Sequence, residues 1–505
     1  MKKINSALVS VYHKDRLDEI VKLLVENNIT IYSTGGTFDY IRGLGIETQS
    51  VESLTLYPSI LGGRVKTLHP KVFGGILARR DNEKDLQQMT EYGIPEIDLV
   101  IVDLYPFEET LAQSTDQDEI IEKIDIGGIS LIRSAAKNFN DVAIVPSKAQ
   151  YNFLIDLLKE KKGYTSKEDR LYLAAQAFNV SSHYDTAIFG FFQKQTQVDA
   201  FKCSIEQKQE MRYGENPHQK GAFYGDINKV FDQLHGKAIS YNNLIDLESA
   251  DNLVREFTDP TFAIIKHTNA CGIASRSTTL AAWKDALACD PVSAYGGVIA
   301  TNCSIDLETA QEINNLFFEI ISAPAYDEDA LEVLKTKKNR IILKRKQVEF
   351  NPVQFRSVLN GVLVQDKDLK TETLEDLKVV TNISPDKSLL DDLLFANIVC
   401  KHTKSNAIVI VKDRQLIGSG VGQTSRVDST RQAIDKAHEF GFELKGAVLA
   451  SDAFFPFADS IELAHKAGIN AFIQPGGSVR DQESIDYCNN NQLGMVFTGV
   501  RHFKH

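Results

Sequence analysis

The stretch SALVSVYHKDRLDEIVKLLVENNITIYSTGGT, residues 6–37, decides the fold of the first part of the chain. It predicts a strand (SALVSVY), an amphipathic helix (DRLDEIVKLLVENN) and a second strand (ITIYST), followed by a glycine turn into a helix that starts near Phe38. Further along, IDLVIVDLYPF, residues 97–107, is typical of a buried parallel strand. This alternation indicates an α/β sheet, and such sheets bind ligands at the carboxyl ends of their strands.

The whole chain has the composition of an ordinary globular protein. Its 505 residues, 43% hydrophobic and 25% charged, predict two to four domains. A net charge of −12 argues against general affinity for nucleic acid, although a small anionic substrate can still occupy a local basic pocket. The first residues lack the apolar run of a signal peptide, and no later run has the length of a membrane span, so we expect a cytoplasmic protein.

Hydroxyl and basic side chains gather after the predicted strands of the first part. STGGT, residues 33–37, offers free N–H groups, hydroxyls and a helix dipole, which together suit a phosphate. Ser10 and Lys14 come from the end of the neighbouring strand. GGRVKTLHPKVFGG, residues 62–75, concentrates positive charge between glycine pairs in an acidic chain, which favours binding of a phosphate or an oxyanion.

Two more loops of the first part carry groups suited to acid–base chemistry. EKIDIGGISLIRSAAKN, residues 122–138, predicts Asp125 at a strand end and then a helix carrying Lys137, and a pair between these two would set their protonation states. Tyr105 adds a phenol at another strand end. Each of these residues has a structural explanation on its own, but four such loops in one sheet domain predict a site.

FAIIKHTNACGIA, residues 262–274, leaves several interpretations open: a metal site, a cysteine nucleophile, an acid–base pair or the polar end of a buried strand. Zinc-ligand spacing is absent, and Cys271 is most simply a small buried residue. The remaining pair, Lys266 and His267, suits a general base beside a cation, although a lone Lys-His pair is weak evidence.

The second part also shows signs of an internal repeat. It follows a polar linker, residues 193–210, and the segments beginning at Ala263 and Ala407 both predict a strand, a Gly- and Ser-rich turn, a helix and an Ala-x-Asp strand end. Arg212 and Tyr213 offer a cation and a stacking ring for a planar or phosphorylated ligand. The basic and aromatic C-terminus, GVRHFKH, predicts a tail that docks against a site.

A set of motifs occurs in order along essentially the whole chain: STGGT, GGRVKTLHPKVFGG, LYPF, IDIGG, RSAAKN, RYGENPHQ, KHTNACG, GQTSRVDS, SDAFFPFADS and RHFKH. Together they closely resemble the bifunctional purine-biosynthesis family that joins AICAR transformylase to IMP cyclohydrolase. The resemblance implies a cyclohydrolase domain over residues 1–197, similar to methylglyoxal synthase in its parallel α/β sheet. It also implies a transformylase domain over residues 198–505, built from two cytidine-deaminase-like α/β halves at about 198–365 and 366–505 that lack the zinc.

The resemblance further implies the chemistry. The second domain would transfer a formyl group from 10-formyltetrahydrofolate, the co-substrate, to AICAR, and the first would close formyl-AICAR to IMP with loss of water. It implies a homodimer with transformylase sites at the interface and no catalytic metal, and it leaves open a structural monovalent cation. No nucleic acid or membrane partner is expected.

The family's functional residues fall on named positions of this chain. The catalytic positions are His267 as base, Lys266 as its cationic partner and Asn406 in the second domain, and Lys66, Tyr105, Asp125 and Lys137 in the first. The substrate-binding positions are Ser10, Lys14, Ser33, Thr34, Gly35, Gly36, Thr37, Arg64, Thr67, Gly127, Arg212, Tyr213, Asn243, Gly296, Arg426, Phe454, Asp459, Arg501 and His505. The family usually has Asn before LYPF and this chain has Asp103, whose charge would either weaken ligand binding or pair with a nearby base.

Two other functions remain as alternatives. Methylglyoxal-synthase-like domains also occur as effector-binding modules, so a regulatory protein that binds a phosphorylated metabolite would fit the STGGT cradle alone. A zinc nucleoside deaminase is the other alternative, and it would contain stoichiometric zinc.

Overall fold

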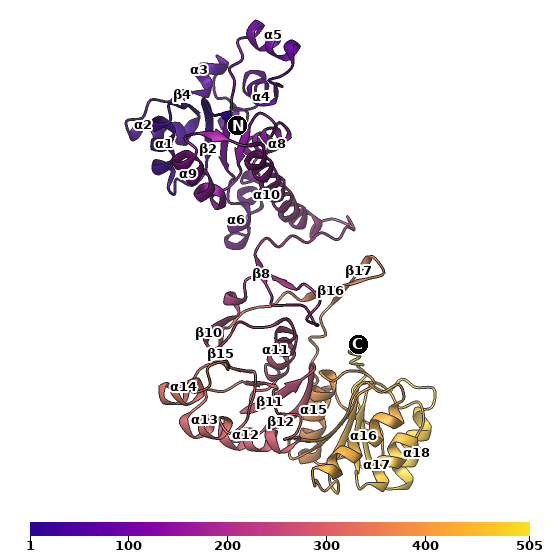
Figure 1. The fold of residues 1–505 in the computed structure, drawn as a ribbon. Helices are drawn as coiled ribbons and strands as arrows, with labels where there is room; N and C mark the ends of the chain where they lie inside the picture. Colours follow the sequence, from indigo (N-terminus) through magenta and orange to yellow (C-terminus); the bar gives the residue numbers. More distant parts are fainter. The chain divides into compact units, whose positions relative to one another are not determined.

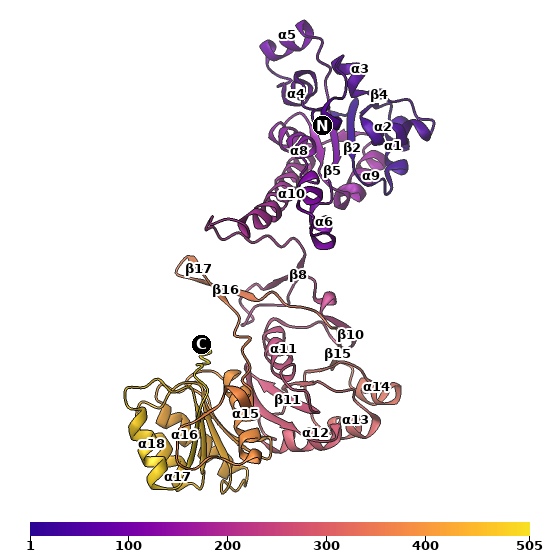
Figure 2. The same ribbon diagram turned by 180° about the vertical axis from the view of Figure 1, so that it is seen from behind.

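The computed structural model describes all 505 residues as two compact units, Met1–Glu206 and Gln207–His505 (Figures 1 and 2). The boundary between the units falls within the polar stretch 193–210. No helix of the chain combines the length and the apolar character needed to cross a membrane.

The first unit is built on a five-stranded sheet. The strand order is β4 (Gln49–Ser50), β3 (Thr30–Ser33), β2 (Ser6–Val11), β5 (Leu99–Asp103) and β6 (Ala143–Val145). Every neighbouring pair is parallel, which confirms the predicted parallel sheet. In Figure 1, α1 (Leu17–Glu26) and α9 (Tyr151–Glu160) lie on one side of the sheet, and α8 (Gly127–Lys137) and α10 (Lys167–Gln193) lie on the other.

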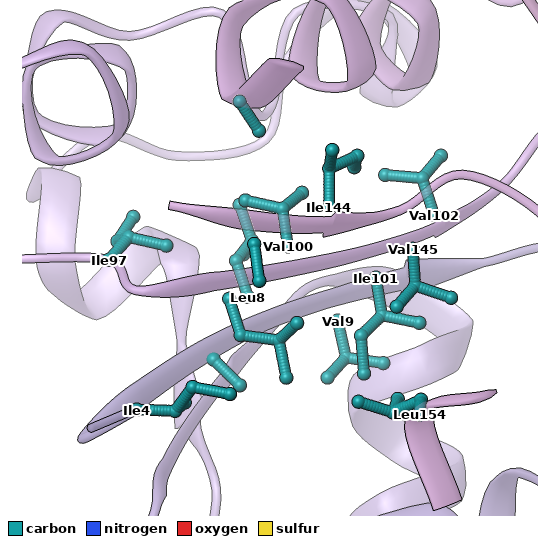
Figure 3. Packing of buried hydrophobic residues seen from close by; sticks show 14 of the residues in the cluster. Ile4, Leu8, Val9, Ile97, Val100, Ile101, Val102, Ile144, Val145 and Leu154 are labelled. Carbon is teal, nitrogen blue, oxygen red and sulfur yellow. The ribbon is translucent and has the colours of Figure 1, made fainter. Parts of the chain in front are cut away.

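The central strands β2 and β5 and the edge strand β6 are buried on both faces, which explains their largely apolar sequences. Figure 3 shows Val100 and Ile144 on one face and Ile101 and Val145 on the other, and all four are fully buried. The smaller elements of the unit are β1 (Lys2–Lys3), α2 (Gly35–Gly43), α3 (Val51–Thr55), α4 (Pro70–Leu77), α5 (Glu83–Glu91), α6 (Phe107–Gln113), α7 (Gln117–Glu122) and β7 (Tyr164–Thr165). A rigid sheet thus fixes the loops that follow its strands.

Two local predictions for this unit are wrong. The helix after STGGT begins at Gly35 rather than near Phe38, because Thr34 is extended and already serves as the N-cap residue. Asp125 does not follow a strand but lies in the short connection between α7 and α8. The apolar run around Asp125 is too short to distinguish a strand from a helix–helix connection.

The second unit contains a mixed twelve-stranded sheet in which two similar halves follow each other. The first half runs α11 (Tyr241–Val254), β11 (Thr261–Lys266), β12 (Asn269–Ser275), α12 (Thr279–Ala288), β13 (Val298–Thr301), α13 (Leu307–Ile313), β14 (Ile320–Ala323), α14 (Glu328–Lys335) and β15 (Ile341–Arg345). The second half repeats this order with α15 (Lys387–Lys401), β19 (Ile408–Lys412), β20 (Gln415–Gly420), α16 (Arg426–Glu439), β21 (Val448–Ser451), α17 (Asp459–Lys466), β22 (Ala471–Gln474), α18 (Asp481–Asn490) and β23 (Gly494–Phe497). The halves meet where β12 pairs with β20.

The repeat is present, but one of its predicted equivalences is wrong. Asp290 follows helix α12, whereas Asp452 follows strand β21. The structural counterpart of Asp452 is Asn302, which follows β13. The prediction failed because the alanine-rich end of α12 has the same Ala-x-Asp pattern as the end of strand β21.

Smaller strands complete the second unit. β10 (Phe231–His235) and β18 (Lys378–Val379) are the two edges of the large sheet. β8 (Lys208–Glu210) pairs with β9 (Ala222–Tyr224). β16 (Val353–Val358) and β17 (Gly361–Asp366) form an antiparallel hairpin outside the large sheet, and Figure 1 shows it projecting from this unit.

Candidate active sites

A basic cradle lies at the carboxyl ends of β2 and β3 in the first unit. Gly35 has a left-handed backbone with φ 53°, and a Cβ there would lie only 2.9 Å from Nζ of Lys66. The Lys14 ammonium donates to the hydroxyl of Thr37 at 3.1 Å. Burial lowers the pKa of Lys14, and the carboxylate of Asp103 opposes that shift. Two ammonium groups therefore converge on the first turn of α2, whose free N–H groups favour an anion.

The other predicted cradle residues differ in whether their side chains already bind other protein groups. Ser33 donates to the carbonyl of Val9 at 2.8 Å, and Thr34 donates to Glu52 at 3.0 Å. Arg64 is exposed and forms an ion pair with Glu122. The space beside Gly36 is open, Ser10 is half-buried at the end of β2, and a Cβ at Gly127 would lie 2.8 Å from the hydroxyl of Thr67.

An acid–base group lies beside this cradle. Asp125 accepts the N–H of Gly128 at 2.6 Å, and its own N–H donates to the hydroxyl of Tyr184 at 2.8 Å. Burial raises the pKa of the Asp125 carboxyl, against the opposing effects of the Gly128 N–H and the Lys66 charge. Burial and the charge of Asp125 raise the pKa of the Tyr105 phenol. The structure thus brings Lys66, Tyr105 and Asp125 into electrostatic contact.

Lys137 does not join that group within the chain. It is exposed at the last position of α8, whereas Asp125 precedes the first position of the same helix. Ten helical steps separate the two ends by about 15 Å. The suggested Asp125–Lys137 pair is therefore wrong within one chain, because the continuous helix holds its two ends apart.

Asp103 pairs with the base His13, which agrees with the second of the two outcomes considered for its charge, pairing rather than weaker ligand binding. Its Oδ2 lies 2.8 Å from Nδ1 of His13 and also accepts the N–H of His13 at 2.8 Å. β2 and β5 are adjacent and parallel, so both residues lie at the same edge of the sheet. The charge of Asp103 is thus shared between His13 and the Lys14 ammonium.

In the second unit, Lys266 and His267 belong to a tight hairpin rather than to the end of a single strand. Lys266 pairs with Asn269, and the two residues between them, His267 and Thr268, have φ of 52° and 66°. Two positive φ values in a two-residue loop define the type I′ geometry that matches strand twist. The N–H of Thr268 donates to the Asp246 carboxylate at 2.7 Å, which holds the turn in place.

The ammonium of Lys266 has a fixed position. It donates to the carbonyl of Tyr295 at 2.8 Å, immediately before Gly296, whose φ is 74°. Lys412 at the equivalent end of β19 donates to the carbonyl of Lys445 at 2.9 Å, immediately before Gly446, whose φ is 80°. The anchored lysine is therefore a repeated feature of the two halves.

The second half has no histidine in the turn that follows its anchored lysine. The hairpin residues Asp413 and Arg414, both with φ 53°, stand where the first half has His267 and Thr268. Their N–H groups bind Asp392 of α15 at 2.8 and 2.7 Å, as Asp246 of α11 binds the first turn. Only the first half therefore presents a histidine at its turn.

Asn269 joins this turn to the loop that carries Asn406. Its amide donates to the carbonyl of His267 at 2.7 Å and its oxygen accepts the N–H of Lys404 at 2.9 Å. Asn406 itself donates to the carbonyl of Gln423 at 2.9 Å. The structure thus brings the predicted catalytic residues of the second unit to adjacent loops.

Arg426 was expected to line a ligand pocket, but it is 7% exposed and forms an ion pair with Asp452, which is 2% exposed. Its other nitrogen donates to Oδ1 of Asn406 at 2.9 Å. Both Nη atoms of this guanidinium are therefore engaged inside the protein, where one of them holds the Asn406 amide.

The remaining predicted residues of this unit lie on its surface or in helix caps. The guanidinium of Arg212 lies over the ring of Tyr213 at 5.7 Å, and Arg501 lies over Phe503 at 4.4 Å. Asn243 accepts the hydroxyl of Ser240, the N-cap residue of α11, at 2.7 Å. Phe454, Asp459 and the terminal His505 are exposed.

Neither a thiolate nor a metal is favoured at this site by the residues present. Cys271 is buried, and burial raises the pKa of its thiol to about 12, far above the range in which a thiolate attacks at neutral pH. No group of three or more His, Cys, Asp or Glu side chains is placed to hold a metal ion.

Comparison with known proteins gives matches over the whole chain. A family model described as the AICARFT/IMPCHase bienzyme matches residues 135–436, and a model of the MGS-like domain matches residues 16–130. The bifunctional purine biosynthesis protein PurH of Bacteroides thetaiotaomicron is 61% identical over 504 residues, which covers 100% of this chain and 99% of that protein. PurH of Aquifex aeolicus is 48% identical over 509 residues, covering 99% and 100% respectively. The chain belongs to the PurH family.

For this member of the PurH family, sequence motifs missed several residues that support the second site. Asp246, Ser405, Asp452 and His502 each hold a loop that carries a predicted catalytic residue or the chain's C-terminus. Asp452 lies in SDAFFPFADS and His502 lies in RHFKH, but neither motif indicates which residues these two side chains contact. The residues that these four contact are distant in sequence, so no local sequence pattern identifies the contacts.

Proposed function

We propose that this PurH-family chain carries both activities of the family, formyl transfer to AICAR and ring closure to IMP. We assign the cyclohydrolase to the first domain, residues 1–197, and the transformylase to the second, residues 198–505. The observation that carries the proposal is the full-length similarity to PurH at 61% identity, because it spans both candidate sites.

In the transformylase step, the 5-amino group of AICAR attacks the formyl carbon of 10-formyltetrahydrofolate. That amine is a weak nucleophile because its lone pair is delocalised into the imidazole and the carboxamide. We assign His267 to take the amine proton during attack. Lys266, held by the Tyr295 carbonyl, retains N–H groups that can stabilise the oxyanion or protonate the departing folate nitrogen. Formyl-AICAR and tetrahydrofolate are the products.

In the cyclohydrolase step, the carboxamide nitrogen of formyl-AICAR attacks the formyl carbon, and the resulting carbinolamine loses water. The phosphate would occupy the cradle of Lys14 and the first turn of α2. Lys66, Tyr105 and Asp125 would stabilise the alkoxide and transfer the protons, because burial has raised the pKa of both Asp125 and Tyr105. The raised pKa lets the Asp125 carboxyl hold a proton more readily than an ordinary aspartate, which suits proton donation during the release of water.

We also propose a homodimer with transformylase sites at the interface. The β16–β17 hairpin supports it, because an isolated two-stranded hairpin is only marginally stable in water. Its apolar side chains are largely exposed: Leu359 (97%), Leu363 (55%), Phe355 (50%), Val364 (48%) and Val362 (45%). A second copy of the chain would bury them. The six free cysteines support a reducing compartment such as the cytoplasm.

The function is tested by supplying the purified protein with AICAR and 10-formyltetrahydrofolate and following IMP. We expect IMP to form with many turnovers per protein. Tight binding of AICAR or IMP without turnover would instead support a regulatory metabolite-binding protein. Stoichiometric zinc in the active protein would support deaminase-type chemistry.

A further inference from the structure

The last residues of the chain pair with the loop that carries Asn406. The N–H of Ser405 donates to the carbonyl of Lys504 at 2.9 Å, and the N–H of Lys504 donates to the Ser405 hydroxyl at 3.0 Å. The Lys504 ammonium donates to the carbonyl of His402 at 2.9 Å. The tail is thus fixed one residue away from Asn406.

His502 anchors the same tail in the protein interior. It is 2% exposed, and its backbone N–H donates to the backbone carbonyl of Asp452 at 3.0 Å. Its Nδ1 lies 2.6 Å from Oδ2 of Asp368, and its Nε2 lies 3.1 Å from Oε2 of Glu372. Two carboxylates around one imidazole hold the ring from both sides, and the ring in turn neutralises a buried carboxylate.

Asp452 connects this anchor to the Asn406 amide. Its carboxylate accepts the guanidinium of Arg426 and the hydroxyl of Ser405, while its carbonyl accepts the N–H of His502. Arg426 then donates to Oδ1 of Asn406 at 2.9 Å. Every link in this chain of contacts is a hydrogen bond in a buried or half-buried setting, where such networks define geometry most strongly.

We propose that His502 is a positioning residue for formyl transfer, which holds the C-terminal tail and, through Asp452 and Ser405, the amide of Asn406. The proposal rests on the proposed transformylase function, because the role of Asn406 does. His502 has both ring nitrogens engaged by carboxylates and acts through its neighbours rather than on substrate. Displacement of a substrate-positioning group by about 1 Å can cost on the order of 100-fold in rate.

The test compares steady-state formyl transfer by wild type and His502→Gln. We expect kcat for formyl transfer to fall about 10- to 100-fold, while ring closure of added formyl-AICAR by the first unit keeps its rate. His465→Gln is the matched control, because His465 lies on α17 and contacts Tyr487 on α18, away from the tail. This variant should keep wild-type kinetics.

A double-variant cycle separates positioning from general loss of structure. If His502 acts through Asn406, then adding His502→Gln to Asn406→Ala should lower kcat by less than about twofold further. The same 10- to 100-fold factor in both backgrounds, or wild-type kcat in His502→Gln, would overturn the proposal. Should His502→Gln fail to fold, Ser405→Ala removes the hydroxyl contacts with the Lys504 N–H and the Asp452 carboxylate but keeps the backbone bond to Lys504, and the same pattern is required of it. A wild-type protein without formyl transfer would overturn the proposed function itself.

Discussion

Lys266 and Lys412 occupy equivalent positions in the two halves of the second unit, each donating its ammonium to a carbonyl that precedes a left-handed glycine. Only Lys266 is followed by a histidine in the adjoining turn. The anchored lysine is therefore part of the repeated fold, and the chemistry depends on what surrounds it.

This equivalence gives a matched pair of variants. Lys266→Ala should lower kcat for formyl transfer by about 100- to 1,000-fold, because it removes the cation that stabilises the transition state. Lys412→Ala removes the same contact from the half without a histidine and should change kcat by less than about threefold. Steady-state formation of formyl-AICAR measures both. Equal losses in the two variants would show that the lysine matters for the fold and not for the reaction.

Asp103→Asn should change the pH dependence of ring closure. The Asp103 charge opposes the lowering of the pKa of Lys14 by burial, so its removal lowers that pKa further. Lys14 would then lose its proton, and its hold on the substrate phosphate, at a lower pH. We expect the KM for formyl-AICAR to begin its alkaline rise at a lower pH than in wild type, with kcat little changed at pH 7. Superimposable KM profiles would exclude Lys14 from phosphate binding.

His502 should make the stability of the second unit depend on alkaline pH. Burial opposes its charge, but the hydrogen bonds to Asp368 and Glu372 prevail and raise the pKa of the imidazole to about 9. A pKa above the unfolded value of about 6.5 contributes stability that is complete below pH 6.5 and is lost as pH rises through 9. Between pH 7 and 10, wild type should lose on the order of 2–3 kcal/mol more free energy of unfolding than His502→Gln. Denaturant unfolding at each pH measures this, and a constant difference between the two proteins would contradict it.

The β16–β17 hairpin should be needed for self-association. Leu363→Asp places a charge on its exposed apolar surface and should raise the dimer dissociation constant by at least about 10-fold, since one buried leucine contributes about 1.5–3 kcal/mol. Light scattering across a concentration series measures the mass. Lys338→Asp, on the connection between α14 and β15, adds an acidic residue away from the hairpin and serves as the control. If both variants associate like wild type, the hairpin is not the interface.

The sequence predicted much of the first unit, because its motifs reflect local requirements. A left-handed turn needs Gly35, and an anion needs basic residues near a helix start, so STGGT and the basic loop were recognisable. The turn at His267 was missed, because two-residue turns with two positive φ values usually contain Asn and Gly.

The supporting contacts could not be predicted in the same way. Lys266 and Tyr295 are 29 residues apart, and Arg426 and Asp452 are 26 apart. Lys266 and Tyr295 meet because β11 and β13 are neighbours in the large sheet, whereas Arg426 reaches Asp452, at the end of β21, from the first turn of α16. Sequence patterns report single elements and turns, whereas these contacts depend on the order of the strands in the sheet.

Complementation between two variants tests the central claim, that one chain carries two separate active sites, most directly. Lys66→Ala should convert AICAR and 10-formyltetrahydrofolate only as far as formyl-AICAR, and His267→Ala should close added formyl-AICAR but make none. Neither variant alone should form IMP from AICAR, whereas a mixture of the two folded proteins should do so through released formyl-AICAR. If the mixture forms no IMP, or if either variant has lost both activities, the assignment of the two reactions to separate sites is contradicted.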